Sequence, residues 1–280
     1  MKIISTEYSQ VLAARIARES GCDLVDVKFS RFPDGEHYLR TGSVDNEILV
    51  VGSVVDSDSF VQLLLLIDAC EGFSPVLLIP YMGYARQDKQ FHAGEPLSAR
   101  AVARGLSSGV SRVYTINIHD PGVLRHFTAP VMNLSLAPEI GAYLDRCGHA
   151  NPLILAPDGG AAPFARIVAA TGGWDCDHLQ KTRISGDEVR IEPKSLPVEG
   201  RDVVIVDDII STGGTIATAA GILLSQGALT VTAACVHGVF AGGAYARLIA
   251  SGVARVAASD TIEQACSAYS AAETVVNGIR

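Results

Sequence analysis

The sequence predicts an α/β protein of two tandem domains, each a mostly parallel sheet flanked by helices. Short β-rich apolar runs alternate with helical patterns along the whole chain, as expected where crossover helices join parallel strands. The chain has 280 residues, which suits two domains, since domains commonly hold about 100 to 150 residues. A polar segment that contains Gly and Pro separates the two halves.

The strands are expected at the apolar runs and the helices at the stretches between them. The predicted strands are 48–51, 76–79, 113–118, 153–155, 203–206 and 231–236. The predicted helices are 9–20, 59–70, 97–106, 138–146, 162–171 and 215–225, each followed closely by Gly or another turn signal. Open parallel sheets bind ligands beyond the carboxyl ends of their strands. The residues that follow each apolar run are therefore where chemistry is expected.

The domain boundary is expected at the segment 145–152, which contains Gly148 and Pro152 and lies between a predicted helix and a predicted strand. Exposed polar segments with Gly and Pro are typical of domain boundaries. The predicted domains are therefore 1–147 and 148–280, and the last residues of the chain are allowed to pack back on the first domain.

The composition excludes several classes of protein. With 48% hydrophobic and 19% charged residues, the chain is not a disordered protein. A net charge of -8 argues against a protein that grips nucleic-acid backbone. The six cysteines lie far apart without a Cys-x-x-Cys pair, which favours a reduced, cytoplasmic protein. Glu7 precedes any apolar signal core, and no apolar run approaches the roughly 20 residues of a membrane helix, so no export and no membrane partner are expected.

The most specific pattern is the segment 203–215, where an apolar strand leads through two acids into a loop of Ser, Thr and Gly that opens a helix. Gly213 and Gly214 let the backbone approach an anion, and a helix start offers unpaired N–H groups with a partial positive charge. The hydroxyls that add further donors are those of Ser211, Thr212 and Thr215. A phosphate would fit this loop.

Asp207 and Asp208 precede the loop and cannot bind a phosphate themselves, because carboxylates are acceptors only. They suit sugar hydroxyls or a hydrated Mg²⁺ beside the phosphate. An ordinary Ser/Thr helix cap is the alternative, but a cap needs neither paired acids nor paired glycines. The whole segment resembles the 5-phosphoribosyl-binding motif of the phosphoribosyltransferase superfamily, which includes both transferases and ribose-phosphate pyrophosphokinases. This resemblance implies two phosphoribosyltransferase-like domains and leaves both reactions open.

The segment 31–36, Arg-Phe-Pro-Asp-Gly-Glu, resembles the ATP segment of ribose-phosphate pyrophosphokinases. The resemblance implies that Phe32 stacks on adenine, and that Asp34 and Glu36 accept hydrogen bonds from the base or nearby groups. Gly35 belongs to the same ATP segment. Pro-Asp-Gly is also a general turn signature, so the segment alone is equally consistent with a plain surface turn.

The segment 84–89, Tyr-Ala-Arg-Gln-Asp-Lys, closely matches a second ATP element of that family. The planar guanidinium of Arg86 can bind a phosphate through two hydrogen bonds or stack on adenine, and the amide of Gln87 can form hydrogen bonds with the polar edge of a ligand. His119 follows the strand 113–118 and aligns with the family's Mg²⁺·ATP-binding histidine. The plain alternatives are a solvated charged loop and a structural histidine.

Three further candidate residues lie in the sequence between His119 and the segment 203–215. Asp158, at a second strand end, aligns with the family's metal-associated aspartate in the pyrophosphate loop. Lys181 and Arg183 resemble the family's catalytic Lys-x-Arg loop, and Arg183 is also assigned to ribose 5-phosphate. In an extended stretch the two cations would point the same way and meet one charged group. A pair of exposed basic residues usually has no function. In a chain with a net charge of -8, however, binding of the transferred phosphates is the better explanation for these two cations.

The motifs run in the family's order from Phe32 to at least Phe240, and the chain resembles the shorter, archaeal-type members. The resemblance implies a ribose-phosphate diphosphokinase. Such an enzyme transfers the β,γ-pyrophosphoryl group of Mg-ATP to the C1 hydroxyl of ribose 5-phosphate, releases AMP and feeds nucleotide biosynthesis. The first domain would be the ATP side and the second the ribose-5-phosphate side. Mg²⁺ is the implied cofactor and a homo-oligomer the implied assembly.

Two alternatives stay open. A phosphoribosyltransferase would consume the diphosphate, but it leaves Phe32, Arg86 and His119 unexplained. A non-catalytic regulatory homologue would be free to lose Lys181 and the acidic pair, yet both are present. A P-loop kinase is excluded, because the sequence has no Gly-x-x-x-x-Gly-Lys-Ser/Thr.

Two positions depart from the family's pattern. Ser211 stands where many relatives carry an acidic residue, and 158–162 reads Asp-Gly-Gly-Ala-Ala in place of the commoner Asp-x-Gly-Gly. Both departures bear on regulation and assembly more than on chemistry.

Overall fold

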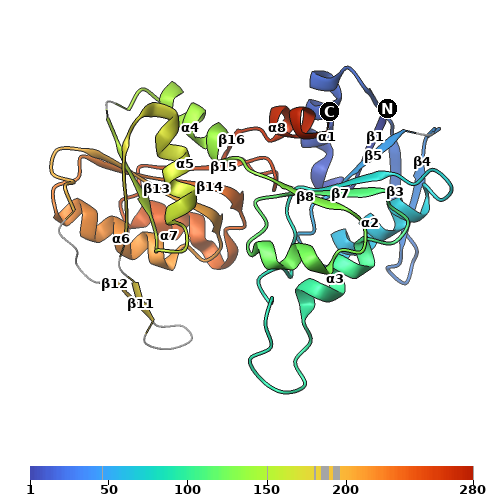
Figure 1. Cartoon of the computed structure of the whole chain (residues 1–280), viewed down its shortest axis with the longest axis horizontal. Helices are drawn as coiled ribbons and strands as arrows, with labels where there is room; N and C mark the ends of the chain where they lie inside the picture. Colours follow the sequence, from blue (N-terminus) through green and yellow to red (C-terminus); the bar gives the residue numbers. More distant parts are fainter. Residues whose placement is uncertain (46, 150, 180, 184–188, 192–195, 280) are drawn as a thin grey trace. The chain divides into compact units, whose positions relative to one another are not determined.

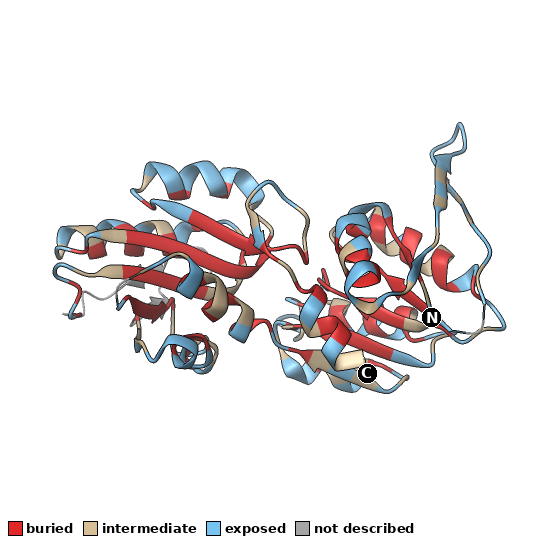
Figure 2. Cartoon of the chain, turned by 90° about the horizontal axis from the view of Figure 1, so that it is seen from above, coloured by how far each residue is buried: buried red, intermediate tan, exposed pale blue. Residues whose placement is uncertain are grey.

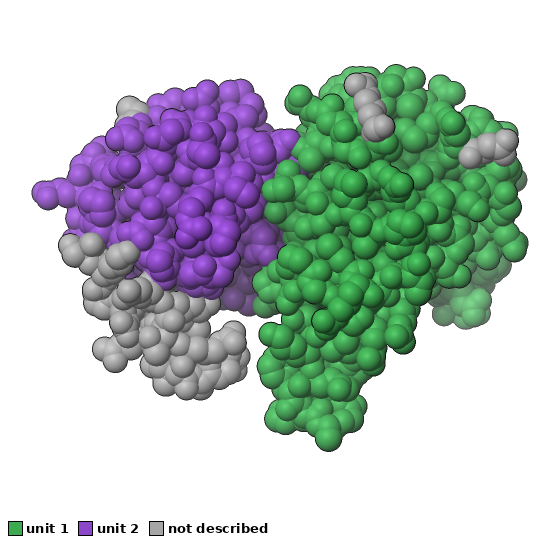
Figure 3. Space-filling view, in the orientation of Figure 1, with its two compact units in different colours: residues 1–135, 261–263, 270–280 green, residues 136–260, 264–269 purple. Residues whose placement is uncertain are grey.

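The computed structural model describes the chain apart from residues 46, 150, 180, 184–188, 192–195 and 280, and for 181–183 and 189–191 it describes the backbone alone (Figure 1). By its contacts the chain divides into two compact units (Figure 3). The first comprises residues 1–135, 261–263 and 270–280, and the second comprises 136–260 and 264–269. Each unit contains a six-stranded sheet in which neighbouring strands run parallel. The predicted fold class is confirmed.

The sheet of the first unit has the strand order β2-β1-β5-β6-β7-β8. The strands are β1 (Lys2–Ser5), β2 (Asp23–Leu24), β5 (Ile48–Val51), β6 (Val76–Ile79), β7 (Arg112–Ile116) and β8 (Val131–Leu134). The helices are α1 (Gln10–Ser20), α2 (Ser57–Asp68), α3 (Ser98–Leu106) and α8 (Ala272–Ile279), with the 3-10 helices η1 (Glu7–Ser9) and η2 (Pro121–His126). Figure 1 shows α2 and α3 on one side of this sheet and α1 and α8 on the other. Central strands covered on both faces must be apolar throughout, and β5 is buried along its whole length. Figure 2 shows buried strands in both units.

A separate antiparallel hairpin belongs to the first unit. It joins β3 (Val27–Arg31) to β4 (His37–Thr41), with Arg31 opposite His37 where the turn begins. Its base packs on the core through the partly buried Val27 and Leu39. Residues 31–36, at its tip, are all exposed.

The sheet of the second unit has the strand order β10-β9-β13-β14-β15-β16. The strands are β9 (Leu153–Ala156), β10 (Asp175–His178), β13 (Asp202–Ile210), β14 (Thr230–Gly238), β15 (Arg255–Ser259) and β16 (Ser267–Tyr269). The helices are α4 (Ala137–Arg146), α5 (Ala162–Gly172), α6 (Gly214–Ser225) and α7 (Ala244–Ala250), with the 3-10 helix η3 (Ala241–Gly243). A second hairpin, β11 (Lys181–Arg183) with β12 (Val189–Ile191), lies outside this sheet.

The second unit begins at Leu136, whereas the sequence placed the domain boundary after residue 147. Helix α4 lies between these two positions. This helix packs against α5, β14 and β16, so its contacts group it with the second unit. The end of the chain returns to the first unit, where α8 packs against α1 and β8.

The predicted strands 48–51 and 76–79 are confirmed to the residue, whereas β13 runs well past its expected end at 206. The strands of both hairpins were not predicted, because their sequences contain no continuous apolar run of the kind that marks a buried strand. Among the described residues, no helix combines the length and the apolar character that crossing a membrane requires.

Candidate active site

Three segments that the sequence singled out follow neighbouring strands of the second unit. The strands β10, β9 and β13 lie side by side. The turn with Asp158 follows β9, the acidic pair lies in the last part of β13, and β10 leads toward the hairpin that begins at Lys181. Parallel strands end at one edge of their sheet, so the structure brings these three segments to a common edge.

Asp207 and Asp208 lie within β13 rather than after it. Asp207 continues the row of Val203 and Ile205, whose side chains pack in the core with α6. The carboxyl group of Asp208, the next residue along the strand, interacts directly with that of Asp207. The strand end therefore holds two adjacent carboxyl groups.

The charge on Asp207 is unfavourable in the absence of a ligand. Loss of hydration raises its pKa well above the ordinary value, and the carboxylates of Asp208 and Asp158 raise it further. A ligand that brings hydroxyl donors or a cation relieves such repulsion. The acidic edge is therefore suited to a polyhydroxy ligand, to a metal ion, or to both.

Asp158 shapes the turn between β9 and α5. Its Oδ1 accepts the backbone N–H of Gly160 at 3.0 Å and that of Ala161 at 3.2 Å. This local bonding holds the carboxylate at the strand end, beside the acids of β13.

The loop after β13 leads into α6 with its first N–H groups unoccupied by a side-chain cap, as far as the described side chains go. Gly213, the residue before the helix, has a left-handed φ of 69°, and a Cβ there would lie 3.2 Å from the Cγ of Leu248. Gly214 has no described atom within 4 Å of where its Cβ would lie. Uncapped N–H groups beside open space are what an anion needs at a helix start.

Arg247, on α7, was not singled out from the sequence. Its guanidinium donates to the carbonyl of Thr212 and, at 3.0 Å, to the carbonyl of Gly242. It thereby ties the loop before α6 to the start of α7. The sequence offers no signal for this role, since the contact joins residues 35 positions apart.

Lys181 and Arg183 both lie on β11, which pairs antiparallel with β12, Lys181 opposite Ile191 and Arg183 opposite Val189. The residue before β11 and most of those between and after the two strands, 180, 184–188 and 192–195, lie outside the described residues. The catalytic assignment of the two cations stays a prediction.

In the first unit, Phe32, Asp34, Gly35 and Glu36 lie together on the turn between β3 and β4. The turn is closed by hydrogen bonds from Phe32 N–H to the Glu36 carbonyl and from Gly35 N–H to the Phe32 carbonyl, both 2.9 Å, and Glu36 N–H donates to Asp34 Oδ1 at 3.3 Å. The Phe32 ring is half exposed and makes an edge-to-face pair with Tyr38, with centroids 5.8 Å apart. The structure therefore presents an exposed aromatic ring beside two carboxylates.

Arg86 and Gln87 lie on the loop after β6, and His119 lies on the loop after the neighbouring strand β7. Arg86 and His119 are exposed, and the Oε1 of Gln87 accepts the hydroxyl of Ser98 at 2.5 Å, at the start of α3.

Asp120 links these two loops and was missed from the sequence. Its carboxylate accepts Gly122 N–H at 2.6 Å, which is the main reason why its pKa is lowered. A hydrogen bond with Asp88 and the charges of Lys89 and His119 lower the pKa further. The signal was available, because Asp120 directly follows His119 at the same strand end.

Within the described parts of the chain, no three side chains of His, Cys, Asp and Glu lie close enough to hold a metal ion by themselves. Mg²⁺ usually keeps several waters and is held by one or two carboxylates together with substrate phosphates. Asp158 and the acids of β13 are oxygen donors of this kind. The donor set of the second unit thus fits a partly hydrated Mg²⁺, while His119 belongs to the first unit.

Comparison with known proteins adds family information to this geometry. Residues 1–109 match the model for the N-terminal domain of ribose phosphate pyrophosphokinase, and residues 140–272 match the phosphoribosyl transferase domain. The chain is 48% identical over 283 aligned residues to a ribose-phosphate pyrophosphokinase of Methanosarcina acetivorans, covering 100% of this chain and 99% of the relative. It is 42% identical to ribose-phosphate pyrophosphokinase 2 of Archaeoglobus fulgidus, with both chains covered completely.

The fold comparison agrees with these relatives. The crystal structure of phosphoribosylpyrophosphate synthetase from Mycobacterium smegmatis superposes with a TM-score of 0.84 at 26% identity. The match covers 100% of this chain and 97% of that one. Both compact units are therefore included in the likeness.

Proposed function

Because the chain belongs to the ribose-phosphate pyrophosphokinase family and is an enzyme of that kind, we propose that it makes 5-phosphoribosyl 1-diphosphate from Mg-ATP and ribose 5-phosphate and releases AMP. The observation that carries this proposal is the common edge of β10, β9 and β13, where the acidic strand end, the Asp158 turn and the uncapped start of α6 adjoin. The synthesis of the diphosphate would feed nucleotide biosynthesis.

Ribose 5-phosphate is proposed to bind in the second unit. Its phosphate would accept N–H groups and hydroxyls of the loop from Ser211 to Thr215, and its ring hydroxyls would donate to Asp207 and Asp208. The raised pKa of Asp207 supports this assignment, since hydroxyl donors stabilise its ionised form. Arg247 would keep the loop in place through its bond to the Thr212 carbonyl.

ATP is proposed to bind in the first unit. Its adenine would stack on Phe32 and be read by Asp34 and Glu36 on the turn that also contains Gly35. Arg86, Gln87 and His119, on the loops after β6 and β7, would bind the polyphosphate and its metal.

The chemistry is one displacement. The C1 hydroxyl oxygen of ribose 5-phosphate forms a bond to the β-phosphorus of ATP, and the bond from that phosphorus to the α,β-bridging oxygen breaks. AMP leaves with the bridging oxygen, and the hydroxyl proton is lost to solvent. The protein's part is to position the hydroxyl and to neutralise charge.

Mg²⁺, when bound, supplies charge neutralisation at the phosphate oxygens. Asp158 is the residue of the second unit proposed to hold it, and His119 that of the first. Lys181 and Arg183 are proposed to place their positive charges against the transferring group.

The test is to incubate the protein with Mg²⁺, ATP and ribose 5-phosphate and to identify the nucleotide product. Release of AMP with one diphosphate product per turnover supports the proposal. ADP would show that only the γ-phosphoryl group moves. If there is no turnover, the protein should next be incubated with 5-phosphoribosyl 1-diphosphate and a nucleobase. Release of pyrophosphate would then identify a phosphoribosyltransferase, and no reaction in this second assay would identify a regulatory homologue.

The two glycines of the phosphate loop provide a prediction about ligand binding alone. We expect Gly214→Ala to raise the KM for ribose 5-phosphate at least about tenfold, because the new methyl group enters the space assigned to the phosphate. It should not destabilise the protein, since Ala is favoured over Gly inside a helix by up to about 1 kcal/mol.

Gly213→Ala is the matched comparison. It forces a left-handed φ on alanine, which costs about 1 to 2 kcal/mol, and crowds Leu248, so it should lower the unfolding temperature. Steady-state kinetics and thermal unfolding of both variants check the pair. Loss of stability in Gly214→Ala without a change in KM would contradict the assignment of the loop.

A cytoplasmic homo-oligomer is part of the same proposal. The reduced state of all six cysteines and the family's usual assembly support it. Light scattering on the purified chain would report its molar mass in solution.

A further inference from the structure

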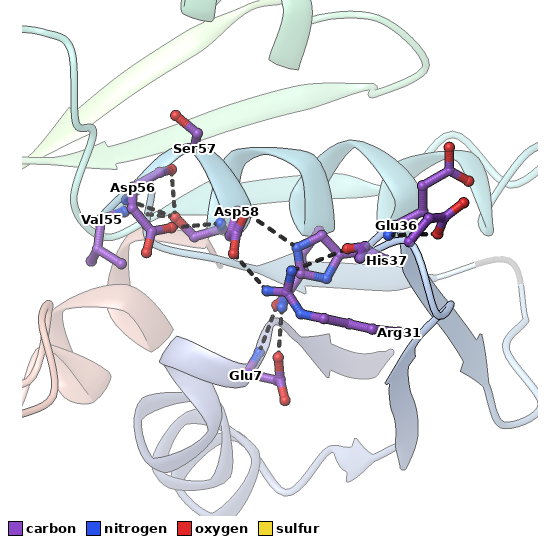
Figure 4. A network of polar contacts seen from close by, with 12 residues as sticks. Glu7, Arg31, Glu36, His37, Val55, Asp56, Ser57 and Asp58 are labelled. Carbon is purple, nitrogen blue, oxygen red and sulfur yellow. Dashed lines mark hydrogen bonds and ion pairs between the residues drawn. The ribbon is translucent and has the colours of Figure 1, made fainter.

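A small polar network fixes the tip of the β3–β4 hairpin to helix α2 in the first unit (Figure 4). One guanidinium group of Arg31 takes part in two contacts. Its Nη1 donates to the carbonyl of Gly35, inside the turn, at 3.1 Å. Its Nη2 donates to the Oδ2 of Asp58, on α2, at 2.5 Å. The same side chain therefore shapes the turn and holds it to another element.

His37 reaches the same carboxylate from the other strand. It stands opposite Arg31 in the hairpin register, and its Nε2 lies 3.6 Å from the Oδ1 of Asp58. The His37 side chain is only 9% exposed. Both residues that border the turn thus face Asp58.

Asp58 is not needed to begin α2. The helix is capped by Asp56, whose Oδ1 accepts Ser59 N–H at 2.7 Å, while the Ser59 hydroxyl oxygen accepts Asp56 N–H at 2.9 Å. The helix itself is held in the core by fully buried residues such as Leu63 and Leu66. The carboxylate of Asp58 takes no part in the helix cap, and α2 holds it at a fixed position where Arg31 and His37 can contact it.

The tip of the hairpin has little else to hold it. Apolar packing secures only the base, through Val27 and Leu39, whereas residues 31–36 are exposed. The Arg31–Asp58 pair is about half exposed, and exposed ion pairs contribute little to global stability. The bond to Asp58 raises the pKa of Arg31 above its ordinary value and lowers that of Asp58.

We propose that Arg31 and Asp58 are positioning residues for the adenine of ATP, which hold the turn with Phe32, Asp34 and Glu36 in its binding conformation. This inference rests on the proposed function. A turn that is ordered before the nucleotide arrives does not have to be ordered by it, so the pair acts on affinity for the adenine nucleotide. It touches no reacting atom and leaves the chemical step unchanged.

The experiment compares Arg31→Ala, Asp58→Ala and the double variant with the wild-type chain. Each single change should raise the KM for ATP at least about fivefold, with kcat and the KM for ribose 5-phosphate within about twofold of wild type. The loss in the double variant should be smaller than the sum of the two single losses, because both single changes remove the Arg31–Asp58 contact. Binding of α,β-methylene ATP, in which the bond that breaks is blocked, should weaken by the same factor.

Two further variants make the test specific. Arg40→Ala removes another cation of the same hairpin, one with no ion pair to any described residue, and should behave like wild type. Arg31→Lys keeps the charge but not the two-pronged geometry, so it should recover only part of the ATP affinity.

The outcomes separate this inference from the proposed function. AMP production by the wild type with unaltered ATP kinetics in the Ala variants overturns the inference alone. Additive losses, or an equal loss in Arg40→Ala, would mean that general charge is responsible and would overturn it too. If the wild type makes no AMP, hydrogen exchange still decides: the amides of Phe32 and Gly35 should exchange faster in Arg31→Ala and Asp58→Ala if the pair orders the turn, and at the wild-type rate if it does not.

Discussion

Replacing Lys181 by alanine is expected to lower kcat by about 100- to 1000-fold, the usual cost of removing one preorganised donor from developing charge. Ribose 5-phosphate affinity should change little, because the phosphate loop and the acids of β13 remain. Lys181 lies on the β11–β12 hairpin, which follows β10 at the acidic edge of the second unit. Single-turnover kinetics, with calorimetric binding of ribose 5-phosphate, would measure the two effects separately.

Thr182→Ala is the matched control for this variant, since Thr182 lies in the same short strand and carries no charge. It should retain most of the wild-type turnover. Equal losses in kcat and in ribose 5-phosphate affinity for Lys181→Ala would instead assign the lysine a simple binding role.

Replacing Asp207 by asparagine should weaken ribose 5-phosphate binding while stabilising the free protein. Loss of a charged acceptor for sugar hydroxyls costs about 1.5 to 3 kcal/mol, or about 10- to 100-fold in affinity. The amide also removes a carboxylate that is poorly hydrated and repelled by Asp208 and Asp158. It can still accept Asp208 N–H, as Asp207 Oδ1 does at 2.9 Å. The variant should therefore unfold at a higher temperature without ligand.

The pH dependence has a definite sign. The folded-state pKa of Asp207 lies above the ordinary 3.8, so its contribution to stability is present below that value and is lost as pH rises through the folded-state pKa. The gain in unfolding temperature of Asp207→Asn over wild type should therefore grow as the pH is raised from about 4. Thermal unfolding at a series of pH values, with Mg²⁺ removed, tests this.

Asp202→Asn, at the other end of β13, is the control with the opposite sign. Asp202 accepts the Thr230 hydroxyl at 2.6 Å and lies 3.0 Å from Nδ1 of His149, and these bonds lower its pKa. Its stabilising contribution is present above 3.8 and is lost as pH falls through the lower folded-state pKa. Asp202→Asn should destabilise the protein at neutral pH and leave ribose 5-phosphate binding unchanged. If both variants shifted stability in the same direction, the electrostatic account of Asp207 would be wrong.

Local patterns in the sequence were sufficient to locate several elements of this protein. Strands covered on both faces have to be apolar throughout, so β5 and β6 could be located to the residue. The turn before α6 could be located because its left-handed residue, Gly213, favours glycine, and the binding of a phosphate there stays a prediction. The family followed from such motifs taken in order, and the comparisons confirm it, archaeal relatives included.

Other features depend on contacts between distant segments and became visible only in the folded chain. A local pattern cannot show that β13 continues through the acids to Ile210, because that extension is stabilised by pairing with β14. The same holds for the grouping of α4 with the second unit and for the bond from Arg247 to the Thr212 loop. Arg31 and Asp58 are ordinary exposed charges in the sequence, 27 positions apart. Only the packing of the hairpin on α2 makes them a pair, since a salt bridge depends on the distance between two side chains and not on the residue types alone.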